Sequence, residues 1–311
     1  MNIGDYMELI EIYIEENYNE RLDSFLTKKL DNVSRNYISK LIKDGSIIIN
    51  GKRSKARYIV KKGDLISIKL PKPKELEVLG ENIPLNIVYE DRDILIVNKP
   101  QGIVTHPAPG NTTGTLVNGL IYYDETISEV GDIARPGIVH RLDKNTSGLL
   151  IVAKNQESYK SLVEDFKTRK IKRKYMALVY GKFSLKEGTI NAPIGRHPVD
   201  RKRMAVVYEN SKEAITDYKV LEEFKDYSLL EIHLQTGRTH QIRVHMAYLK
   251  HPIVGDGIYS RRKNEFKIHN QLLHAKSLGF YHPRTKEYME IESDLPEEFS
   301  NIVELLRKRN R

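Results

Sequence analysis

Two prolines within four residues, in the segment Pro71-Lys72-Pro73-Lys74, divide this 311-residue chain into a short and a long part. Proline fixes φ and has no backbone N–H, so this segment stops a strand and favours an extended linker. The length also favours two domains over one. We therefore expect a small domain over residues 13–74 and a larger one over residues 85–311.

Positive charge is concentrated in the short part. Residues 21–74 contain 15 Lys and Arg against four Asp and Glu, whereas the whole chain has a net charge of +9. Clustered like charges repel one another and usually serve a polyanionic partner, although a solvated surface with a skewed charge is the simpler alternative. Phosphate contacts from these side chains would supply affinity without sequence information.

Composition limits the function classes. The chain contains no Cys, which rules out disulfides, thiolate nucleophiles and Cys-ligated metals. No apolar run approaches the ~18–20 residues of a membrane span. Residues 1–20 carry six carboxylates and no Lys or Arg, the reverse of the basic start of a signal peptide. We expect a cytoplasmic protein, monomeric by default, with no membrane partner.

The short part has the pattern of a folded module. Helical spacing is carried by Leu22, Phe25, Leu26 and Leu30. Ser34 can cap a second helix that ends at Gly45, and the Asn50-Gly51 turn after residues 47–49 is a hairpin signal. Residues 60–70 predict another strand pair. Candidate phosphate contacts here are Arg35, Lys40, Lys43, Lys52 and Arg53.

The long part mixes strands and helices without βαβ regularity. Short apolar runs predict strands at 87–91, 94–99, 149–153, 175–179 and 229–234. Helical patterns fall at 158–167, 240–249 and 297–309. This order favours an α+β catalytic domain built on a mixed, mainly antiparallel sheet.

The densest polar segment, residues 140–147, lies between two apolar runs. Loops held by rigid strands often carry catalytic groups. Asp143 lies there, with Lys144 beside it and Arg141 two residues before. Asp143 is therefore a candidate nucleophile or acid/base, and a structural turn carboxylate is the commoner alternative for a single Asp.

A second polar segment covers residues 235–246. His240 and His245 are five residues apart with no Glu between them, which argues against a zinc site of the H-E-x-x-H type. Arg243 could pair with a buried carboxylate and fix its orientation. The alternative is a set of helix-surface residues that are solvated or paired locally.

Two further segments are basic. Six of the eight residues 167–174 are cationic and Tyr175 follows, a combination suited to a phosphate backbone and a base. An inward-pointing tyrosine is more often part of the core. Residues 195–204 are typical of an exposed basic loop. These segments give the RNA-binding candidates Lys172, Arg173, Lys174, Arg201 and Arg203.

Taken in order, these motifs resemble one family. Residues 21–64, with R-L-D-x-F-L, I-x-I-N-G-K and V-K-x-G-D, resemble the S4-type RNA-binding domain. The remainder resembles the RluA/RluD-type ribosomal large-subunit pseudouridine synthases. The matching motifs are N-K-P-x-G (98–102), H-R-L-D-K-N-T-S-G-L-L (140–150), R-K-Y-x-A-L-V-x-G (173–181), P-I-G-R-H-P (193–198), T-G-R-T-H-Q-I-R-V-H (236–245) and H-P-I-V-G-D (251–256).

The resemblance implies that the chain isomerises uridine to pseudouridine in RNA, with 23S rRNA or the large ribosomal subunit as the expected partner. It implies that Asp143 is catalytic and paired with Arg243, and that Tyr175 stacks on the target uracil. Ile242 would pack on the opposite face of the uracil, and Arg141 would fill the gap left by the flipped base. The family uses no cofactor and no metal.

Several alternatives stay open at this level. Asp143 could attack the anomeric carbon or remove a proton from the sugar. A non-catalytic RNA-binding or ribosome-assembly protein would have no need of Asp143, Tyr175 and Arg243 together. A metal-dependent phosphodiesterase would have to use His140, His240 and His245, and the sequence lacks a clustered Asp/Glu–His ligand set.

Overall fold

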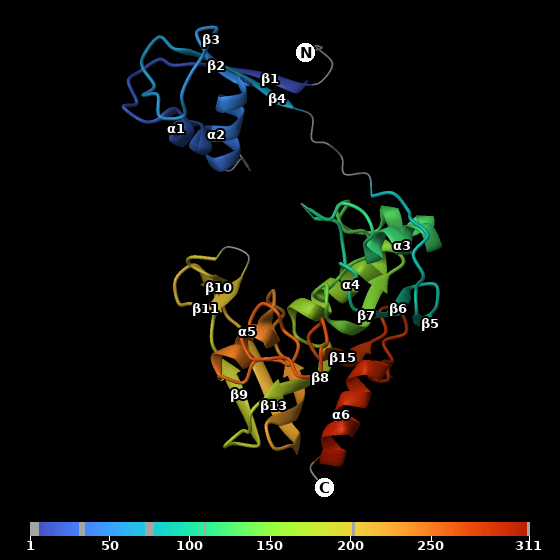
Figure 1. The fold of residues 1–311 in the computed structure, drawn as a ribbon. Coiled ribbons are helices and arrows are strands. Elements are labelled where there is room, and N and C mark those ends of the chain that lie inside the picture. Colours follow the sequence, from blue (N-terminus) through green and yellow to red (C-terminus); the bar gives the residue numbers. More distant parts are fainter. Residues whose placement is uncertain (1–5, 31–34, 72–77, 109, 201–202, 310–311) are drawn as a thin grey trace. The chain divides into compact units, whose positions relative to one another are not determined.

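The computed structural model describes residues 6–30, 35–71, 78–108, 110–200 and 203–309. The chain forms two compact units, Met1–Glu75 and Leu76–Arg311, each with its own apolar core (Figure 1). Among the described residues, no helix is both long and apolar enough to cross a membrane.

The first unit combines a four-stranded antiparallel sheet with two helices. The strands β1 (Tyr6–Tyr13), β2 (Ile47–Ile49), β3 (Lys52–Arg53) and β4 (Leu65–Pro71) lie in the order β1-β4-β2-β3. The helices are α1 (Leu22–Lys29) and α2 (Arg35–Asp44). Their apolar faces pack on the sheet, as the helical spacing predicts. Asn50 and Gly51 both have φ in the left-handed region, as a two-residue hairpin turn requires.

The N-terminal strand corrects two expectations. Residues 60–70 do not form a strand pair: β4 pairs with β1 along Tyr13↔Leu65 to Tyr6↔Pro71 and with β2 on its other side. The acidic composition of this segment, with Glu at 8, 11, 15 and 16, does not predict a strand. Tyr6–Tyr13 nevertheless forms the strand that pairs with β4. The unit therefore begins before residue 13. Ser34 and residues 72–74 of the expected linker lie outside the described residues.

The second unit is built on one large sheet. Its strand order is β5-β6-β7-β15-β8-β14-β13-β9, with β16 paired to β15. The strands are β5 (Ile87–Glu90), β6 (Ile94–Lys99), β7 (Ser147–Ala153), β8 (Lys172–Tyr180), β9 (Glu187–Asn191), β13 (Ile215–Glu223), β14 (Tyr227–Leu234), β15 (Leu273–Tyr281) and β16 (Tyr288–Glu292). Only β7 and β15 pair in parallel among the described strands of this sheet. The predicted α+β class with a mixed, mainly antiparallel sheet is confirmed.

Helices cover both faces of this sheet. They are α3 (Leu116–Tyr123), the short 3-10 helix η2 (Glu125–Glu129), α4 (Gln156–Lys167), α5 (Gln241–Tyr248) and α6 (Glu297–Arg309). Tyr175, Ala177 and Val179 of β8 share a core with α3 and α5. The alternate residues Met176, Leu178 and Tyr180 share a core with α6. The period of two in β8 thus assigns α5 and α6 to opposite faces, on separate sides of the sheet in Figure 1.

The second unit also contains a small separate sheet and an N-terminal segment that packs on its core. A small sheet has the order β11-β10-β12 and consists of β10 (Ile194–Arg196), β11 (Met204–Val206) and β12 (Ser211–Lys212). Val78 packs against the main core and the Glu81 N–H donates to Asn118 O, so the unit begins before the expected residue 85.

The start of β7 fixes the loop that precedes it. All seven residues of β7 are buried. Gly148 has φ +115°, and a Cβ there would lie 2.3 Å from the backbone oxygen of Ala275 on the parallel strand β15. Only glycine allows this close approach of the two backbones. The polar loop before Ser147 is therefore held against a rigid strand.

Candidate active site

The loop that carries Asp143 is fastened from two sides. Thr105 Oγ1 donates to the Leu142 carbonyl at 2.8 Å and accepts from its N–H at 3.3 Å. Lys99, fully buried, donates through Nζ to the carbonyls of Pro100, Ile103 and Lys144 at 2.8, 3.0 and 3.2 Å. The backbone on both sides of Asp143 is therefore immobilised.

Lys99 places a buried amine behind this loop. Burial lowers the pKa of Lys99 to about 7, and the negative charge of Asp143 opposes that shift. The three carbonyl acceptors use all three N–H groups of an ammonium, so the hydrogen bonds favour the charged form. A positive charge then lies behind the Asp143 loop.

Asp143 is paired with Arg243, a residue 100 positions away in sequence. Arg243 Nη1 donates to Asp143 Oδ2 at 3.1 Å. The other edge of the guanidinium binds Asp256 bidentately, with Nε to Oδ2 at 2.7 Å and Nη2 to Oδ1 at 3.0 Å. The side chain of Asp256 is fully buried and that of Asp143 is 17% exposed. Asp256 therefore fixes the guanidinium, and Arg243 presents its remaining edge to the carboxylate that is open to solvent.

Electrostatics favour the charged forms of Arg243 and Asp256. Burial opposes the charge of Arg243, but Asp256 and then Asp143 outweigh it and raise the pKa of Arg243. Burial likewise opposes ionisation of Asp256, but hydrogen bonds and the charge of Arg243 lower its pKa. One guanidinium thus holds two carboxylates, and Asp143 is the one that faces the pocket.

The pocket brings together all five predicted catalytic and substrate-binding residues. It has a volume of about 540 Å³. Its lining includes Arg141, Asp143, Tyr175, Ile242 and Arg243. Tyr175, Ile242 and Arg243 are buried, whereas Arg141 is exposed. The cavity combines the Asp143 carboxylate with aromatic and aliphatic side chains and with several Arg and Lys side chains.

Strand alternation divides the basic run at residues 167–174. Arg173 and Tyr175 line the pocket, and the Arg173 guanidinium donates to the carbonyls of Leu234 and Thr236 at 3.3 and 3.2 Å. On the other face, Lys172 lies 5.6 Å from the ring centroid of Tyr288 and Lys174 forms ion pairs with glutamates of β16. Neighbouring residues of a strand point to opposite faces, so Lys172 and Lys174 face away from the pocket that Arg173 and Tyr175 line. A role of these three cations in RNA binding stays a prediction.

The cations predicted to bind RNA in the first unit are exposed. They are Arg35, Lys40, Lys43, Lys52 and Arg53. Arg35 also donates to the buried Asp23, with Nε to Oδ2 at 3.1 Å, and Arg21 binds the same carboxylate bidentately. One buried carboxylate thereby orients two half-exposed guanidinium groups.

The basic loop over residues 195–204 is only partly described. Arg201 lies outside the described residues. Arg203 is half-buried instead of exposed, with its guanidinium 5.3 Å from the ring centroid of Tyr259. Packing on an aromatic ring removes it from the exposed loop surface that the sequence predicts.

The three histidines have different environments. His140 accepts the N–H of Ile151 at 3.0 Å, and burial, then the charge of Arg173, lower its pKa to about 3. His245 is fully buried between Thr216 Oγ1 and the Ala192 carbonyl, both at 2.9 Å. His240 lies beside Asp143, with Nε2 4.0 Å from Oδ2. Only His240 is adjacent to the candidate catalytic group.

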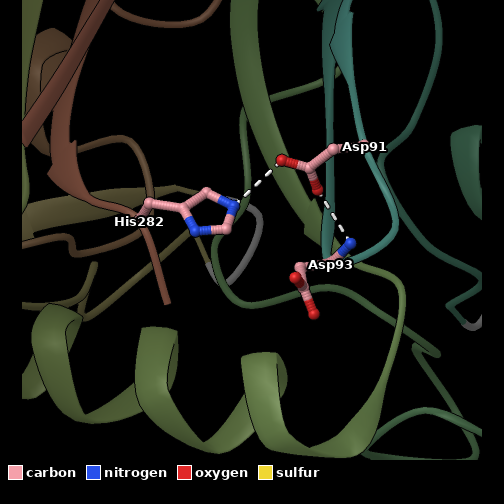
Figure 2. Close-up of side chains that lie close together, drawn as sticks. All are labelled: Asp91, Asp93 and His282. Atoms are coloured by element: carbon pink, nitrogen blue, oxygen red, sulfur yellow. Dashed lines mark hydrogen bonds and ion pairs between the residues drawn. The ribbon is translucent and has the colours of Figure 1, made fainter. Parts of the chain in front are cut away.

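One other cluster, Asp91, Asp93 and His282, has the composition of a metal site (Figure 2). His282 Nδ1 accepts backbone N–H groups of Arg284 and Thr285, so its proton lies on Nε2 and is donated to Asp91 at 2.9 Å. Asp93 accepts two hydrogen bonds of 2.7 Å from Arg284. These groups already satisfy one another, and the cluster fastens the β5–β6 turn to the turn after β15.

Sequence reasoning missed several residues that build this site. Asp256, Lys99, Thr105 and Tyr259 were not among the predicted site residues. Asp256 ends the H-P-I-V-G-D motif and Lys99 belongs to N-K-P-x-G, so both lie in quoted motifs. A buried charge needs a partner. That rule could have marked Asp256 as a second carboxylate for Arg243.

Comparisons with known proteins agree with this geometry. The family model for RNA pseudouridylate synthases matches residues 93–248, and that for the S4 domain matches residues 20–66. An "Uncharacterized RNA pseudouridine synthase YlyB" of Bacillus subtilis is 49% identical over 294 residues, which cover 94% of this chain and 96% of that protein. "Ribosomal large subunit pseudouridine synthase D" of Escherichia coli (strain K12) is 38% identical, covering 97% and 95%.

Solved structures give the same result. "Human RNA Pseudouridylate Synthase Domain Containing 1" is similar with a TM-score of 0.56 and 29% identity, covering 76% of this chain and 97% of that one. The matched family model spans the loop of Asp143, the strand β8 of Tyr175 and the helix α5 of Arg243. With an S4 domain ahead of this catalytic unit, the chain belongs to the RNA pseudouridine synthase family.

Proposed function

We propose that this protein isomerises specific uridines to pseudouridine in the RNA of the large ribosomal subunit, 23S rRNA. The observation that carries the proposal is the Asp143 carboxylate, which faces the pocket and is held at 3.1 Å by the buried Arg243. Relatives named "Ribosomal large subunit pseudouridine synthase D", at 38–41% identity over nearly the whole chain, support the choice of rRNA. The S4 domain supports RNA as the partner.

Asp143 acts on the ribose of the target nucleotide. Its carboxylate either attacks the anomeric carbon or removes a proton from the sugar, and the bond from that carbon to the uracil nitrogen breaks. The uracil rotates and its carbon 5 bonds to the anomeric carbon. On the first route this bond displaces the Asp143 carboxylate, and on the second the abstracted proton returns to the sugar. The hydrogen of carbon 5 leaves as a proton, and the released uracil nitrogen gains one. Both routes need the Asp143 carboxylate held at the ribose, and the Arg243 guanidinium fixes its orientation.

Three other residues hold the flipped nucleotide. Tyr175 stacks on one face of the uracil and Ile242 packs on the other, because both line the cavity beside Asp143. Arg141, exposed at the mouth of this cavity, fills the gap in the RNA stack. Unstacking a base costs roughly a few kcal/mol, which these contacts offset.

The first unit supplies sequence-independent contacts to phosphates. Its exposed cations Arg35, Lys40, Lys43, Lys52 and Arg53 carry this role. A cytoplasmic location and a monomeric state stay predictions.

Release of tritium from rRNA labelled at carbon 5 of uridine tests the function. We expect release by the wild-type protein and a loss of at least about a thousandfold in Asp143→Asn, because an amide cannot act as nucleophile or base. The matched control is Asp294→Asn, which alters an exposed carboxylate away from the pocket and keeps full activity. Substantial activity in Asp143→Asn would sink the assignment of Asp143.

A further inference from the structure

Tyr259 is tied to the network that holds Asp143. Its backbone N–H donates to Asp256 Oδ1 at 3.0 Å, the same carboxylate that binds Arg243. The Arg243 guanidinium also lies 5.1 Å from the centroid of the Tyr259 ring. The position of the ring is therefore set by groups of the active site.

The Tyr259 hydroxyl has two neighbours with different roles. The backbone N–H of Met204, on β11, donates to the hydroxyl oxygen at 2.9 Å. His240 Nδ1 lies 2.8 Å from the same oxygen. In the described part of the chain these are the two hydrogen-bond partners of the hydroxyl, so its own proton finds an acceptor among them only if Nδ1 carries none. The geometry thus favours His240 with its proton on Nε2.

This nitrogen faces Asp143. His240 Nε2 lies 4.0 Å from Asp143 Oδ2, too far for a direct hydrogen bond and close enough to share a bound ribose. Burial lowers the pKa of His240, and the opposing charge of Asp143 is the smaller effect, so the imidazole is neutral at pH 7. The ring presents one uncharged N–H donor beside the candidate catalytic carboxylate.

The backbone of His240 is also specialised. Its φ of +57° lies in the left-handed region, which is uncommon for residues other than glycine. His240 occupies the N-cap position of α5, but its side chain makes no capping hydrogen bond. It is hydrogen-bonded to the Tyr259 hydroxyl instead. An unfavourable backbone conformation that the surroundings maintain is typical of functional sites.

We infer that Tyr259 is a positioning residue of the active site: its hydroxyl holds His240 in the neutral form with the proton on Nε2, directed toward Asp143 and the target ribose. This inference rests on the proposed function. In that form His240 donates a hydrogen bond to a ribose oxygen when the nucleotide occupies the gap between Nε2 and Asp143. In the other tautomer a lone pair would face the carboxylate and the donor would be lost.

The test uses the full-length protein and two readouts. Nitrogen-15 NMR of the His240 ring reports the tautomer without reference to activity. Tritium release from labelled rRNA gives kcat and KM. Tyr259→Phe removes the hydroxyl and keeps the ring that packs on Arg243. Tyr180→Phe, which removes the hydroxyl of a buried tyrosine from the core shared with α6, is the matched control.

We expect the wild-type ring to carry its proton on Nε2 and the Tyr259→Phe ring to move toward the Nδ1 form. The kcat of Tyr259→Phe falls about tenfold, the worth of one hydrogen bond, with KM within about twofold of wild type. Tyr180→Phe keeps the wild-type kcat. In a His240→Gln background, which has no tautomer to fix, adding Tyr259→Phe changes kcat no further.

Three results would overturn the inference: a proton on Nδ1 in the wild type, an unchanged kcat in Tyr259→Phe, or the same loss in the His240→Gln background. A merely structural tyrosine would give the third result, because its removal would act independently of residue 240. Failure of the proposed function is distinguishable, since the wild type would then release no tritium while NMR still reports the tautomer.

Discussion

Both units contain an Asp–Arg cluster of three side chains, but the first has one Asp with two Arg and the second has one Arg with two Asp. In the first unit the buried Asp23 binds Arg21 and Arg35, whose side chains are 49% and 51% exposed. In the second unit the buried Arg243, 5% exposed, binds Asp143 and Asp256. One arrangement presents two guanidinium groups at the surface, and the other presents one carboxylate to a pocket.

The two clusters suit different tasks, RNA binding in the first unit and the reaction in the second. Exposed guanidinium groups with a fixed orientation suit phosphates, which the RNA backbone offers at every nucleotide. A buried guanidinium has no access to phosphate and instead orients a carboxylate. The concentration of positive charge in residues 21–74 therefore belongs to binding, while the reaction depends on one carboxylate whose orientation a buried guanidinium fixes.

Among changes that leave Asp143 itself in place, the largest effect should follow from breaking the second arrangement at Asp256. In Asp256→Asn the Arg243 guanidinium loses its charged bidentate partner and no longer holds Asp143 in one orientation. We expect kcat for pseudouridine formation to fall about a hundredfold, and breaking the buried pair to cost about 3–5 kcal/mol of stability. Thermal unfolding and tritium release measure the two effects.

Asp93→Asn is the matched control, because it breaks a bidentate Asp–Arg pair with Arg284 outside the pocket. It should lower stability and leave kcat per folded molecule unchanged. An equal loss of kcat in both variants would contradict a specific role of Asp256 in the active site.

Removing residues 1–75 should have a smaller effect on chemistry than on binding. The second unit has its own cores, so we expect it to stay folded. Affinity for rRNA at about 0.15 M salt should fall at least about tenfold, with a shallower salt dependence, while kcat at saturating RNA changes less than about threefold. Filter binding across a salt series checks this. Unchanged affinity would refute the docking role of the basic unit.

The smallest effect concerns one guanidinium of the first arrangement. Arg35→Gln should weaken rRNA binding about threefold and lower the slope of log affinity against log salt by about 1, the loss of one phosphate contact. Lys308→Gln, at an exposed position of α6, is the control with an unchanged slope. A wild-type slope in Arg35→Gln would mean that Arg35 binds only Asp23 and makes no contact with an RNA phosphate.

The sequence predicted elements where the signal is local. The Asn50-Gly51 hairpin, the helices α1, α2, α5 and α6 and the buried strands β6 and β7 follow from periodicity and turn residues. β1 was missed because its partner β4 lies more than fifty residues away, and pairing at that distance leaves no local pattern.

The same distinction applies to the site. Asp143 and Arg243 could be singled out, but their 3.1 Å contact across 100 residues comes from the tertiary fold. The division of Lys172 and Lys174 from Arg173 and Tyr175 follows from strand alternation, which the interpretation as one basic run overlooked. Tyr259 gave no signal at all, because its role depends on hydrogen bonds to Met204 and His240.

Pseudouridine mapping in cellular RNA tests the central claim most directly. Ribosomal and transfer RNA would be compared between cells that contain the wild-type protein, cells that lack it and cells that contain only Asp143→Asn. The account predicts that one or more uridines of the large-subunit rRNA stay unmodified in the last two and are pseudouridine in the first. Unchanged rRNA in cells that lack the protein, or a loss confined to transfer RNA, would contradict it.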